Sequence, residues 1–565
     1  MIHFPPHYEE GAHAGPAPSA ANPARACPRK ALVRKVRAVP PCASQKYCRP
    51  YDQFYYRFVS SSTRPEKTRG QLPPRSTATK KPYILVFLCM FHRNIRVFLC
   101  VFHRNIRAFL CYNIHIRSLL VFFSIKPENT SNMERELYQN LVQWKFSDGR
   151  KPLVLKGARQ VGKTWLLKTF GTVEFETCAY LNCDDNNQAK DIFDSYFDTK
   201  RIIRDISAVT RTEILPGKTL IIIDEIQEVP RALQSLKYFC ENAPEYHVCA
   251  AGSLLGISIH KETSFPVGKV DLMTLYPLTY KEFVRAIEGD ILADRLENGA
   301  LSEFTSIREK LTDLLRQYYF TGGMPEIVLE YQKQNSLSKV RERQNAILAG
   351  YSDDISKHTD TRMAIRIHQV WNSIAQQLTK GNKRFIYGNI QRGARAKDFE
   401  LAIQWLSDAG IVYRVPRIRK AAIPLKFYED FDAFKLFYLD CGLMGAVAEA
   451  PADQILIGNN IFEEYKGAFT EQYVLQQLMV YRNNTIFYYD SDDSKQEIDF
   501  ITQSGNQILA MEVKAEENLR AKSLRQFKID HPETKAVRLS MSSYREEDWL
   551  TNVPLYLTHR VFSIS

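Results

Sequence analysis

The sequence lacks the features of a secreted or membrane-spanning protein. Residues 1–30 contain no short apolar stretch of the kind that a secretory signal needs. Arg and His interrupt the apolar runs of residues 87–117 well before the roughly 18 residues that a membrane span requires. The five cysteines after residue 132 form neither a C-x-x-C pair nor a metal-binding spacing. We therefore expect a cytoplasmic protein with reduced thiols and no membrane partner.

Acidic residues are scarce in one part of the chain, residues 1–132. This segment holds 21 of the 76 Lys and Arg residues but 5 of the 63 Asp and Glu residues. The remaining 55 basic and 58 acidic residues nearly balance. The net charge of +13 therefore does not indicate a DNA-binding surface on the rest of the chain.

The same segment contains a short tandem repeat, FLCMFHRNIRV (87–97) followed by FLCVFHRNIRA (98–108) and a decayed third copy. Known repeat folds have periods of roughly 20 residues or more, and Arg and His in these copies leave no obvious core. We expect residues 1–132 to be a disordered leader, translated from upstream DNA, with the native start at Met133. A folded or membrane-associated leader is the open alternative.

A phosphate-binding loop is predicted between a short apolar strand and an amphipathic helix within residues 152–170. GARQVGKT fits the spacing G-x-x-x-x-G-K-T. Its glycines let main-chain N–H groups close on phosphate, and the helix N-terminus adds partial positive charge. Lys163 would contact the β- and γ-phosphates, and Thr164 would bind Mg²⁺. The predicted ATP-binding residues of the loop are Gly157, Ala158, Arg159, Gln160, Val161, Gly162, Lys163 and Thr164.

Two more strands are expected beside this loop. KTLIIIDEIQEVP (218–230) contains an apolar strand, typical of a parallel sheet buried on both faces, that ends in Asp224 and Glu225. Asp224 would hold Mg²⁺ together with Thr164, and Glu225 would orient the attacking water. The predicted catalytic residues of this domain are therefore Glu225 and the phosphate-binding Lys163. YHVCAAGSLLG (246–256) places Ser253 where its hydroxyl could sense the γ-phosphate, although Gly-Ser is also ordinary turn chemistry.

These segments resemble the AAA-type P-loop ATPases, in particular a prokaryotic branch with a C-terminal domain of unknown function. GARQVGKT, IIIDEIQ, AAGS, VDLMTLYPLTYKEF (270–283), YYFTGGMPEIV (318–328) and YSDDISKH (351–358) follow the order of that family's sequence blocks. The resemblance begins at Met133 and implies ATP and Mg²⁺ as cofactors. Such ATPases usually need an arginine at the γ-phosphate. Just before LYPLTYKEF, where we would look for this arginine, the sequence has Lys269, which lacks the planar fork of arginine. Arg285 is a second candidate, without a specific sequence signal.

The pattern after the loop divides the chain further. We expect an AAA-type domain at 133–290, a helical lid at 291–364 and a winged-helix-like module at 365–450, in which a helix is followed by Gly410 and a strand. Basic residues near the start of that helix could contact DNA phosphates. They could equally be the solvated face of a module that connects domains. These residues are Arg392, Arg395 and Lys397.

Residues 451–565 are predicted to form a C-terminal α/β domain. Glu512 and Lys514 share one face of the strand QILAMEVKA, and Asp499 lies on a preceding strand that can pair with it as a hairpin. With Glu471 on the helix before them, these residues resemble the core of PD-(D/E)XK nucleases. Asp499 and Glu512 would hold divalent metal, and Lys514 would position or activate water. Alternatively, the fold is kept for binding, and Glu512 and Lys514 form a surface salt bridge.

The expected fold class is therefore α/β, with a P-loop parallel-sheet ATPase core, a helical lid, a winged-helix-like middle and a nuclease-like C-terminal domain. The favoured function is a Mg²⁺-dependent ATPase that acts on or near DNA, with ATP, DNA and further copies of the chain as candidate partners. The alternative is a nucleotide-controlled regulatory protein whose C-terminal domain recognises a partner without cutting. The presence of all three nuclease-like residues, Asp499, Glu512 and Lys514, favours the ATPase that acts on DNA. Lys269 in place of an arginine favours the regulatory protein.

Overall fold

The computed structural model describes residues 84–91, 94–101, 114–115, 133–259, 265–380, 383–457, 463–482, 484–491, 496–515 and 520–564. The chain forms two compact units, residues 1–122 and 123–565. In the first unit, β1 (Ile84–Phe91) pairs antiparallel with β2 (Asn94–Val101), and β2 pairs with β3 (Ile114–His115). The predicted disorder of residues 1–132 concerns residues that lie almost wholly outside those described, and it stays a prediction.

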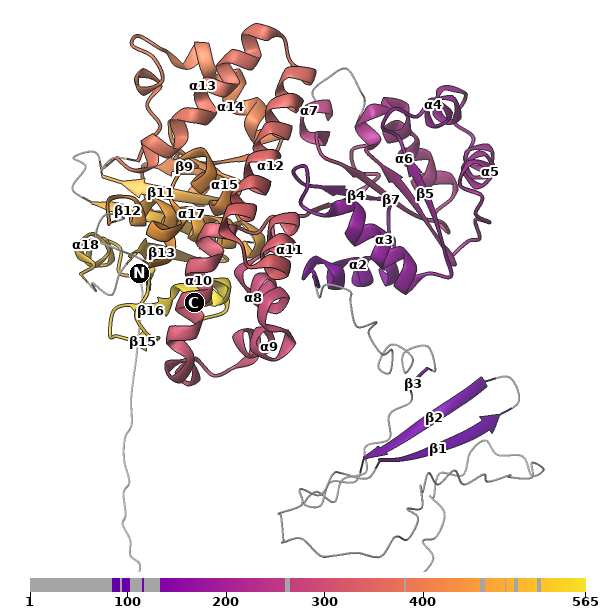
Figure 1. Ribbon diagram of the computed structural model, residues 1–565, viewed down its shortest axis with the longest axis horizontal. Coiled ribbons are helices and arrows are strands. Elements are labelled where there is room, and N and C mark those ends of the chain that lie inside the picture. Colours follow the sequence, from indigo (N-terminus) through magenta and orange to yellow (C-terminus); the bar gives the residue numbers. More distant parts are fainter. Residues whose placement is uncertain are drawn as a thin grey trace, which may run out of the picture. The chain divides into compact units, whose positions relative to one another are not determined.

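The second unit contains a five-stranded parallel sheet in the order β5-β6-β7-β4-β8 (Figure 1). Its strands are β4 (Leu153–Lys156), β5 (Thr177–Asn182), β6 (Thr219–Asp224), β7 (His247–Gly252) and β8 (Asp271–Thr274). The helices around it are α2 (Leu137–Phe146), α3 (Lys163–Glu174), α4 (Asn187–Asp194), α5 (Thr199–Thr210), α6 (Pro230–Asn242) and α7 (Leu255–Ile259). This architecture confirms the parallel-sheet core expected from the sequence.

Alternate side chains of β6 enter two different cores, as the continuous apolar run of this strand predicts. Leu220 and Ile222 pack in a core that includes Phe170 of α3. Ile221 and Ile223 pack in a core built with α4, α5 and α6. The strand is therefore buried on both faces, and its two acidic residues come at the edge of the sheet, where β6 ends.

A helical region follows the sheet. It consists of α8 (Tyr280–Glu288), α9 (Asp290–Asn298), α10 (Arg308–Thr321), α11 (Pro325–Gln334), α12 (Leu337–His358), α13 (Thr361–Leu378) and α14 (Ala396–Asp408). Thr279 and Glu282 form a reciprocal capping box that starts α8, and Pro325 occupies the first turn of α11. The helical character of residues 291–364 is confirmed, and their role as a lid stays a prediction.

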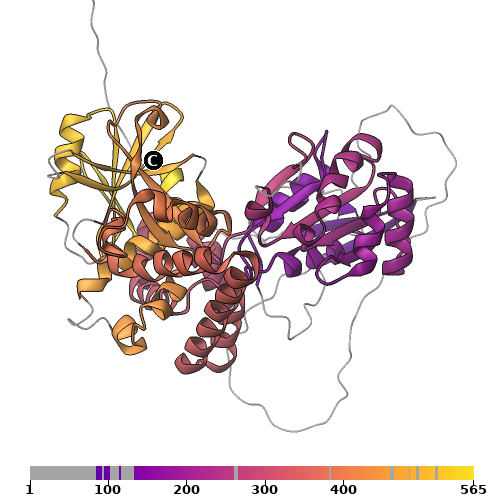
Figure 2. The same cartoon turned by 90° about the horizontal axis from the view of Figure 1, so that it is seen from above.

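The rest of the unit, coloured orange to yellow in Figure 2, is built on a mixed eight-stranded sheet. Its strand order is β10-β9-β11-β12-β13-β14-β16-β15. Its strands are β9 (Val412–Ile418), β10 (Glu429–Tyr438), β11 (Ile486–Asp490), β12 (Glu497–Ser504), β13 (Gln507–Val513), β14 (Lys535–Ser540), β15 (Arg545–Glu546) and β16 (Thr551–Pro554). The short helices here are α15 (Cys441–Val447), α16 (Ala452–Ile457) and α19 (Val561–Ile564). Helix α17 (Glu463–Tyr481) contacts β10 and β13, and α18 (Lys522–Asp530) contacts β12, β13 and β14. The predicted hairpin of β12 and β13 is confirmed.

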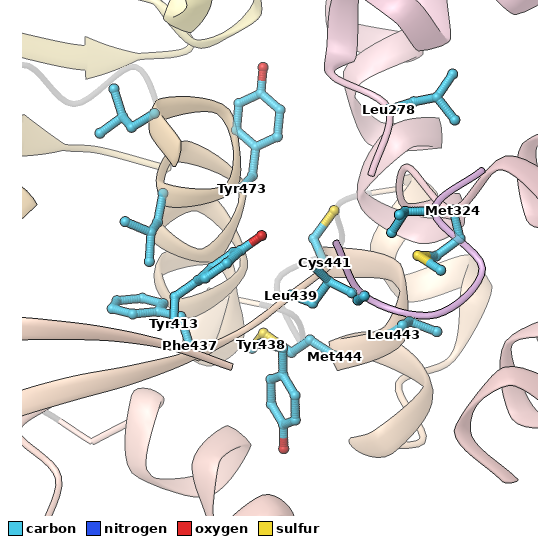
Figure 3. Close-up of a cluster of buried hydrophobic side chains, with 14 of the residues drawn as sticks. Leu278, Met324, Tyr413, Phe437, Tyr438, Leu439, Cys441, Leu443, Met444 and Tyr473 are labelled. Atoms are coloured by element: carbon cyan, nitrogen blue, oxygen red, sulfur yellow. The ribbon is translucent and has the colours of Figure 1, made fainter. Parts of the chain in front are cut away.

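This sheet takes strands from both sides of residue 450, because β9 pairs in parallel with β11. The proposed boundary between residues 365–450 and 451–565 is therefore not a break in the sheet, and the five-part division of the chain stays a prediction. Buried side chains of β10, α15 and α17 share one core with Leu278 and Met324 (Figure 3). None of the described helices has both the length and the apolar character needed to cross a bilayer.

Candidate nucleotide site

The predicted phosphate loop joins β4 to α3, and two of its positions require glycine. Gly157 has a φ of 153°, and a Cβ there would lie 2.3 Å from the main-chain oxygen of Leu275. Gly162 has a φ of 93° and is the residue before the first turn of α3. Larger residues are disfavoured at both positions, by a clash at the first and by strain at the second. Because both positions are glycine, the main-chain N–H groups of the loop remain accessible to a phosphate in front of the helix N-terminus.

Lys163 folds back over the loop that it terminates. Its Nζ donates hydrogen bonds to the main-chain oxygens of Gly157, at 3.0 Å, and Ala158, at 2.9 Å. The side chain is buried, and burial lowers the pKa of Lys163 to about 8, although the nearby Glu225 and Asp224 oppose this change. A phosphate that enters the loop would give this buried cation an anionic partner.

Thr164 and Asp224 meet at the ends of α3 and β6. The Thr164 hydroxyl donates to Asp224 Oδ2 at 2.7 Å, and the hydroxyl of Tyr180 donates to the same oxygen at 3.0 Å. Asp224 is 2% exposed, and these hydrogen bonds hold its carboxylate at the end of β6. A hydroxyl and a carboxylate at this distance are a suitable pair of oxygen ligands for Mg²⁺.

Glu225 is held by hydrogen bonds to its carboxylate. Ser253 Oγ donates to Glu225 Oε2 at 3.1 Å, and Gln227 Nε2 donates to the same oxygen at 2.7 Å. Glu225 has a φ of 48°, uncommon for a residue with a Cβ. The structure thus brings Ser253 to Glu225. Sequence reasoning missed Gln227, although it lies two residues after Glu225.

A residue that the sequence did not indicate, Arg135, supports the loop from behind. Its guanidinium donates to the main-chain oxygens of Val161, at 2.8 Å, and Tyr276, at 2.6 Å, and to Glu282 Oε1 at 3.0 Å. Arg135 is 5% exposed, so these bonds form away from water. Nothing in the local sequence marks Arg135, because its partners lie 26 to 147 residues away.

The loop is also tied to the helical region through Arg159. Its side chain forms an ion pair with Asp354 of α12, and its main-chain oxygen accepts a hydrogen bond of 3.1 Å from the Tyr351 hydroxyl. Arg159 is half exposed, whereas Tyr351 is buried. Both partners come from the block YSDDISKH, so this segment contacts the loop directly.

The two cations considered for the γ-phosphate are engaged elsewhere. Lys269 Nζ lies 2.9 Å from Glu241 Oε1. Arg285 pairs with Asp294 at 2.7 Å and with Asp290 at 3.4 Å. Neither contact involves a residue of the predicted loop.

The basic residues considered for DNA lie near the start of α14. Arg392, Arg395 and Lys397 are all exposed, and Arg395 precedes the first turn of the helix. Their exposure is compatible with either a binding surface or a solvated face. Their role stays a prediction.

The predicted nuclease-like residues gather at the β12–β13 hairpin. Asp499 Oδ2 accepts a hydrogen bond of 2.8 Å from the main-chain nitrogen of Val513. Lys514, just past the end of β13, places its Nζ 2.6 Å from Glu512 Oε1, as expected for residues on one face. Burial raises the pKa of Glu512, with Lys514 opposing and Asp499 adding to the change.

Glu471 of α17 joins this group, together with a lysine that the sequence did not indicate. Glu471 Oε1 forms an ion pair with Lys383. Burial and the charge of Asp499 raise the pKa of Glu471 to about 7, with Lys383 opposing. Burial would lower the pKa of Lys383, but Glu471 and Asp499 outweigh burial and raise it. Lys383 thus supplies a positive charge where the sequence predicted a metal ion.

Two oxygens of this carboxylate group are buried without a hydrogen-bond partner in the described part of the chain, Glu471 Oε2 and Glu512 Oε2. Such oxygens fit a cation, because an unpartnered buried carboxylate oxygen is costly. Within the ranges that the structure describes, however, no three His, Cys, Asp or Glu side chains gather closely enough to hold a metal ion. The predicted metal ligands Asp499 and Glu512 therefore belong to a group of carboxylates and lysines, and their metal role stays a prediction.

Comparison with known families gives three matches along the chain. Residues 149–284 match a family described as an AAA domain. Residues 312–454 and 466–557 match two domains of unknown function, DUF8612 and DUF4143. The chain thus carries an AAA-type P-loop ATPase domain followed by two regions of unknown function. Neither of these regions is described as a nuclease, so the nuclease-like interpretation stays a prediction.

Curated proteins offer no match to this chain. Among solved structures, the Walker-type ATPase PABY2304 of Pyrococcus abyssi is similar with a TM-score of 0.38 and 13% identity, over 57% of this chain and 99% of that one. The Orc1 protein of Aeropyrum pernix, solved in complex with DNA, has a TM-score of 0.24 and 12% identity, over 59% of this chain and 96% of that one.

Proposed function

We propose that this chain binds Mg²⁺-ATP at residues 157–164 and hydrolyses it. The observation that carries the proposal is the meeting of Lys163, the Thr164–Asp224 pair and the Glu225–Ser253 pair beside one phosphate loop. A chance glycine turn would not place a buried lysine and an acidic pair at the same edge of the sheet. The AAA match over residues 149–284 supports the same activity.

Each residue has a separate task in this proposal. Main-chain N–H groups of the loop bind phosphate oxygens, and Lys163 neutralises charge on the β- and γ-phosphates. Thr164 and Asp224 would hold Mg²⁺, which supplies positive charge to the same oxygens. Glu225 orients the attacking water, and Ser253 and Gln227 fix the carboxylate that performs this step.

Two substitutions in the full chain test the proposal. Lys163→Ala should weaken ATP binding, because a phosphate charge loses its partner. Glu225→Gln should keep ATP binding but lower kcat, because it alters the group that orients water and leaves the phosphate contacts in place. Binding is measured by calorimetry and turnover by phosphate release. Hydrolysis by Lys163→Ala at the wild-type rate would contradict the assignment of the loop.

A second activity is proposed for the C-terminal part, binding of a divalent cation by Asp499 and Glu512, with Glu471 beside them, and cleavage of DNA. Its support is the pair of buried carboxylate oxygens, Glu471 Oε2 and Glu512 Oε2, that lack a described hydrogen-bond partner. The cation would supply a polarised water, and Lys514 would position that water.

The competing function is a nucleotide-controlled binding protein that does not cut. It is supported by Lys383, which already pairs with Glu471. Plasmid nicking in the presence of Mn²⁺, compared between the wild type and Asp499→Ala, distinguishes the two. Nicking that depends on Asp499 supports the nuclease, and no nicking together with no calorimetric Mn²⁺ binding supports the regulatory protein.

DNA remains the proposed partner, through Arg392, Arg395 and Lys397. Binding through phosphate contacts should fall steeply with added salt, and replacing the three residues by alanine should flatten that dependence. Self-association is proposed as well, and sedimentation with and without ATP tests it.

A further inference from the structure

A cavity of about 270 Å³ lies directly beside the proposed phosphate loop. One side of it is formed by the ends of three strands of the parallel sheet, at residues 156–158, 252–256 and 274–276. The other side is formed by the end of α14, at residues 407–410, and by side chains of the C-terminal sheet and α17. The cavity therefore connects the loop with residues that follow it by more than 240 positions.

The cavity borders the first two residues of the loop and Ser253. Gly157 and Ala158, whose carbonyl oxygens accept from Lys163, both line it. Ser253 lines it too, and Ser253 hydrogen-bonds the carboxylate of Glu225. A group that reaches into this cavity from the opposite side would thus approach the start of the loop, beside residues that Lys163 and Glu225 contact.

Arg482 is such a group. It is the first residue after α17, and its main-chain nitrogen donates to Leu478 O at 3.0 Å, which fixes the position of its backbone at the helix end. Its side chain is half buried and lines the cavity together with Tyr413. The Tyr413 hydroxyl is buried without a hydrogen-bond partner among the described residues, so a polar group in the lining near Arg482 is available to a ligand.

Among the described residues, no carboxylate forms an ion pair with the guanidinium of Arg482, whereas Lys269 and Arg285 are both paired. Asp408 lines the same cavity, but its Oδ1 accepts a hydrogen bond of 2.8 Å from Gln404. Lys156 is a second cation in the lining, but it lacks the planar fork that matches two phosphate oxygens at once.

We propose that Arg482 is the arginine that stabilises charge on the γ-phosphate in the transition state, supplied by the same chain from the end of α17. This assignment rests on the proposed ATPase activity. It makes Arg482 a catalytic residue that would touch the transferred phosphate oxygens when ATP is bound. ATP hydrolysis would then depend on the position of the C-terminal part of the chain, because α17 belongs to that part.

The test uses the full chain with Arg482→Ala, Arg482→Lys and, as a matched control, Lys269→Ala. Arg482→Ala should lower kcat by about a hundredfold or more, since an arginine at this position acts mainly in the transition state. Its Kd for ADP should stay within about twofold of the wild-type value, and its thermal unfolding should be unchanged. The kcat of Arg482→Lys should fall between those of Arg482→Ala and the wild type. The kcat of Lys269→Ala should match that of the wild type.

A second measurement separates catalysis from a structural role. The complex of ADP with aluminium fluoride imitates the transferred phosphate, so the wild type should bind it more tightly than ADP alone, and Arg482→Ala should lose this preference. Equal losses of ADP and ADP–aluminium fluoride affinity in Arg482→Ala would overturn the assignment. A normal kcat in Arg482→Ala would also overturn it. So would a result in which Lys156→Ala loses kcat and Arg482→Ala does not.

Mixing decides whether the arginine acts within one chain. Arg482→Ala and Lys163→Ala are combined in equal amounts, each inactive for a different reason. If Arg482 acts within its own chain, the mixture stays inactive. Recovered hydrolysis would mean that a neighbouring copy supplies the arginine, which overturns the proposal. A wild-type chain that neither binds nor hydrolyses ATP would instead refute the proposed function itself, and the role of Arg482 with it.

Discussion

The hydroxyl of Tyr351 in α12 donates a hydrogen bond of 3.1 Å to the main-chain oxygen of Arg159 in the phosphate loop. Next to it, the Arg159 side chain pairs with Asp354, one helical turn further along α12. The loop therefore has two attachments to a helix almost 200 residues away in the sequence. A change in this helix can reach the loop without passing through the parallel sheet.

Tyr351→Phe should destabilise the protein by about 1 kcal/mol, because the partly buried hydrogen bond to the main-chain oxygen of Arg159 is lost. It should also raise the Kd for ATP severalfold, since the loop is less firmly held. Urea unfolding and calorimetric titration measure the two effects. Tyr196→Phe is the matched control, because Tyr196 is 69% exposed. Equal effects of the two substitutions would show that the bond to Arg159 has no special role.

ATP binding should weaken at alkaline pH. Burial lowers the pKa of Lys163 to about 8, and only its protonated form attracts phosphate. Bound phosphate raises this pKa again, so above pH 8 the free site must take up a proton to bind ATP. The Kd should therefore rise about tenfold per pH unit above 8 and stay nearly constant below it. Lys163→Arg, which remains charged, should lose this dependence, and an unchanged profile in that variant would place the titrating group elsewhere.

Residues 1–132 should be dispensable, whereas Arg135 should not. Deleting 1–132 should leave the thermal midpoint and ATP affinity unchanged, because residues 1–122 form a separate compact unit. Arg135→Ala should cost about 3–5 kcal/mol, because Glu282 loses its buried cationic partner. Thermal unfolding and calorimetric ATP titration check the deletion, and urea unfolding measures the cost of Arg135→Ala. Arg204→Ala, whose side chain is 76% exposed, is the control and should cost less than about 1 kcal/mol.

Cation binding by the C-terminal carboxylates should depend on Lys383 and on pH. Glu471 has a pKa raised to about 7, so it is protonated in acid and can bind a cation only as the pH rises through 7. Mn²⁺ affinity, measured by calorimetry, should therefore increase between pH 6 and pH 8. Lys383→Met should increase it further, because the competing ammonium group is gone. Glu471→Gln should weaken the pH dependence, leaving the part that comes from Glu512, and a wild-type profile in that variant would contradict the assignment.

The site was predictable from the sequence where its residues are local. The phosphate loop and the acidic pair after β6 follow from short motifs between strands and helices, and the apolar run of β6 predicted a strand buried on both faces. Ser253 followed from the next strand in the same way. These signals depend on neighbours within about ten residues, which is the range over which strand and helix patterns can be recognised.

The remaining contacts could not be predicted because their partners are brought together by tertiary packing. Arg135, Lys383 and Arg482 lie outside the quoted motifs, and each of them acts near residues more than 25 positions away. An isolated arginine or lysine in a sequence is most often a solvated side chain, so none of them carries a local signal. The same holds for Tyr351, which the block YSDDISKH contained without indicating that it touches the loop.

Helix α17 carries Glu471 in its middle and ends immediately before Arg482, so one straight segment separates the carboxylate group from the cavity beside the loop. At the rise of an α-helix, 11 residues span about 16 Å. Between these positions, the buried Gln476 and Gln477 bond the hydroxyl of Tyr318, and Gln476 also bonds Asp440. Because its main-chain bonds keep its length fixed, we expect the helix to respond as one rigid segment. Displacement of its middle, by a cation or a partner at Glu471, would be transmitted along its axis to Arg482.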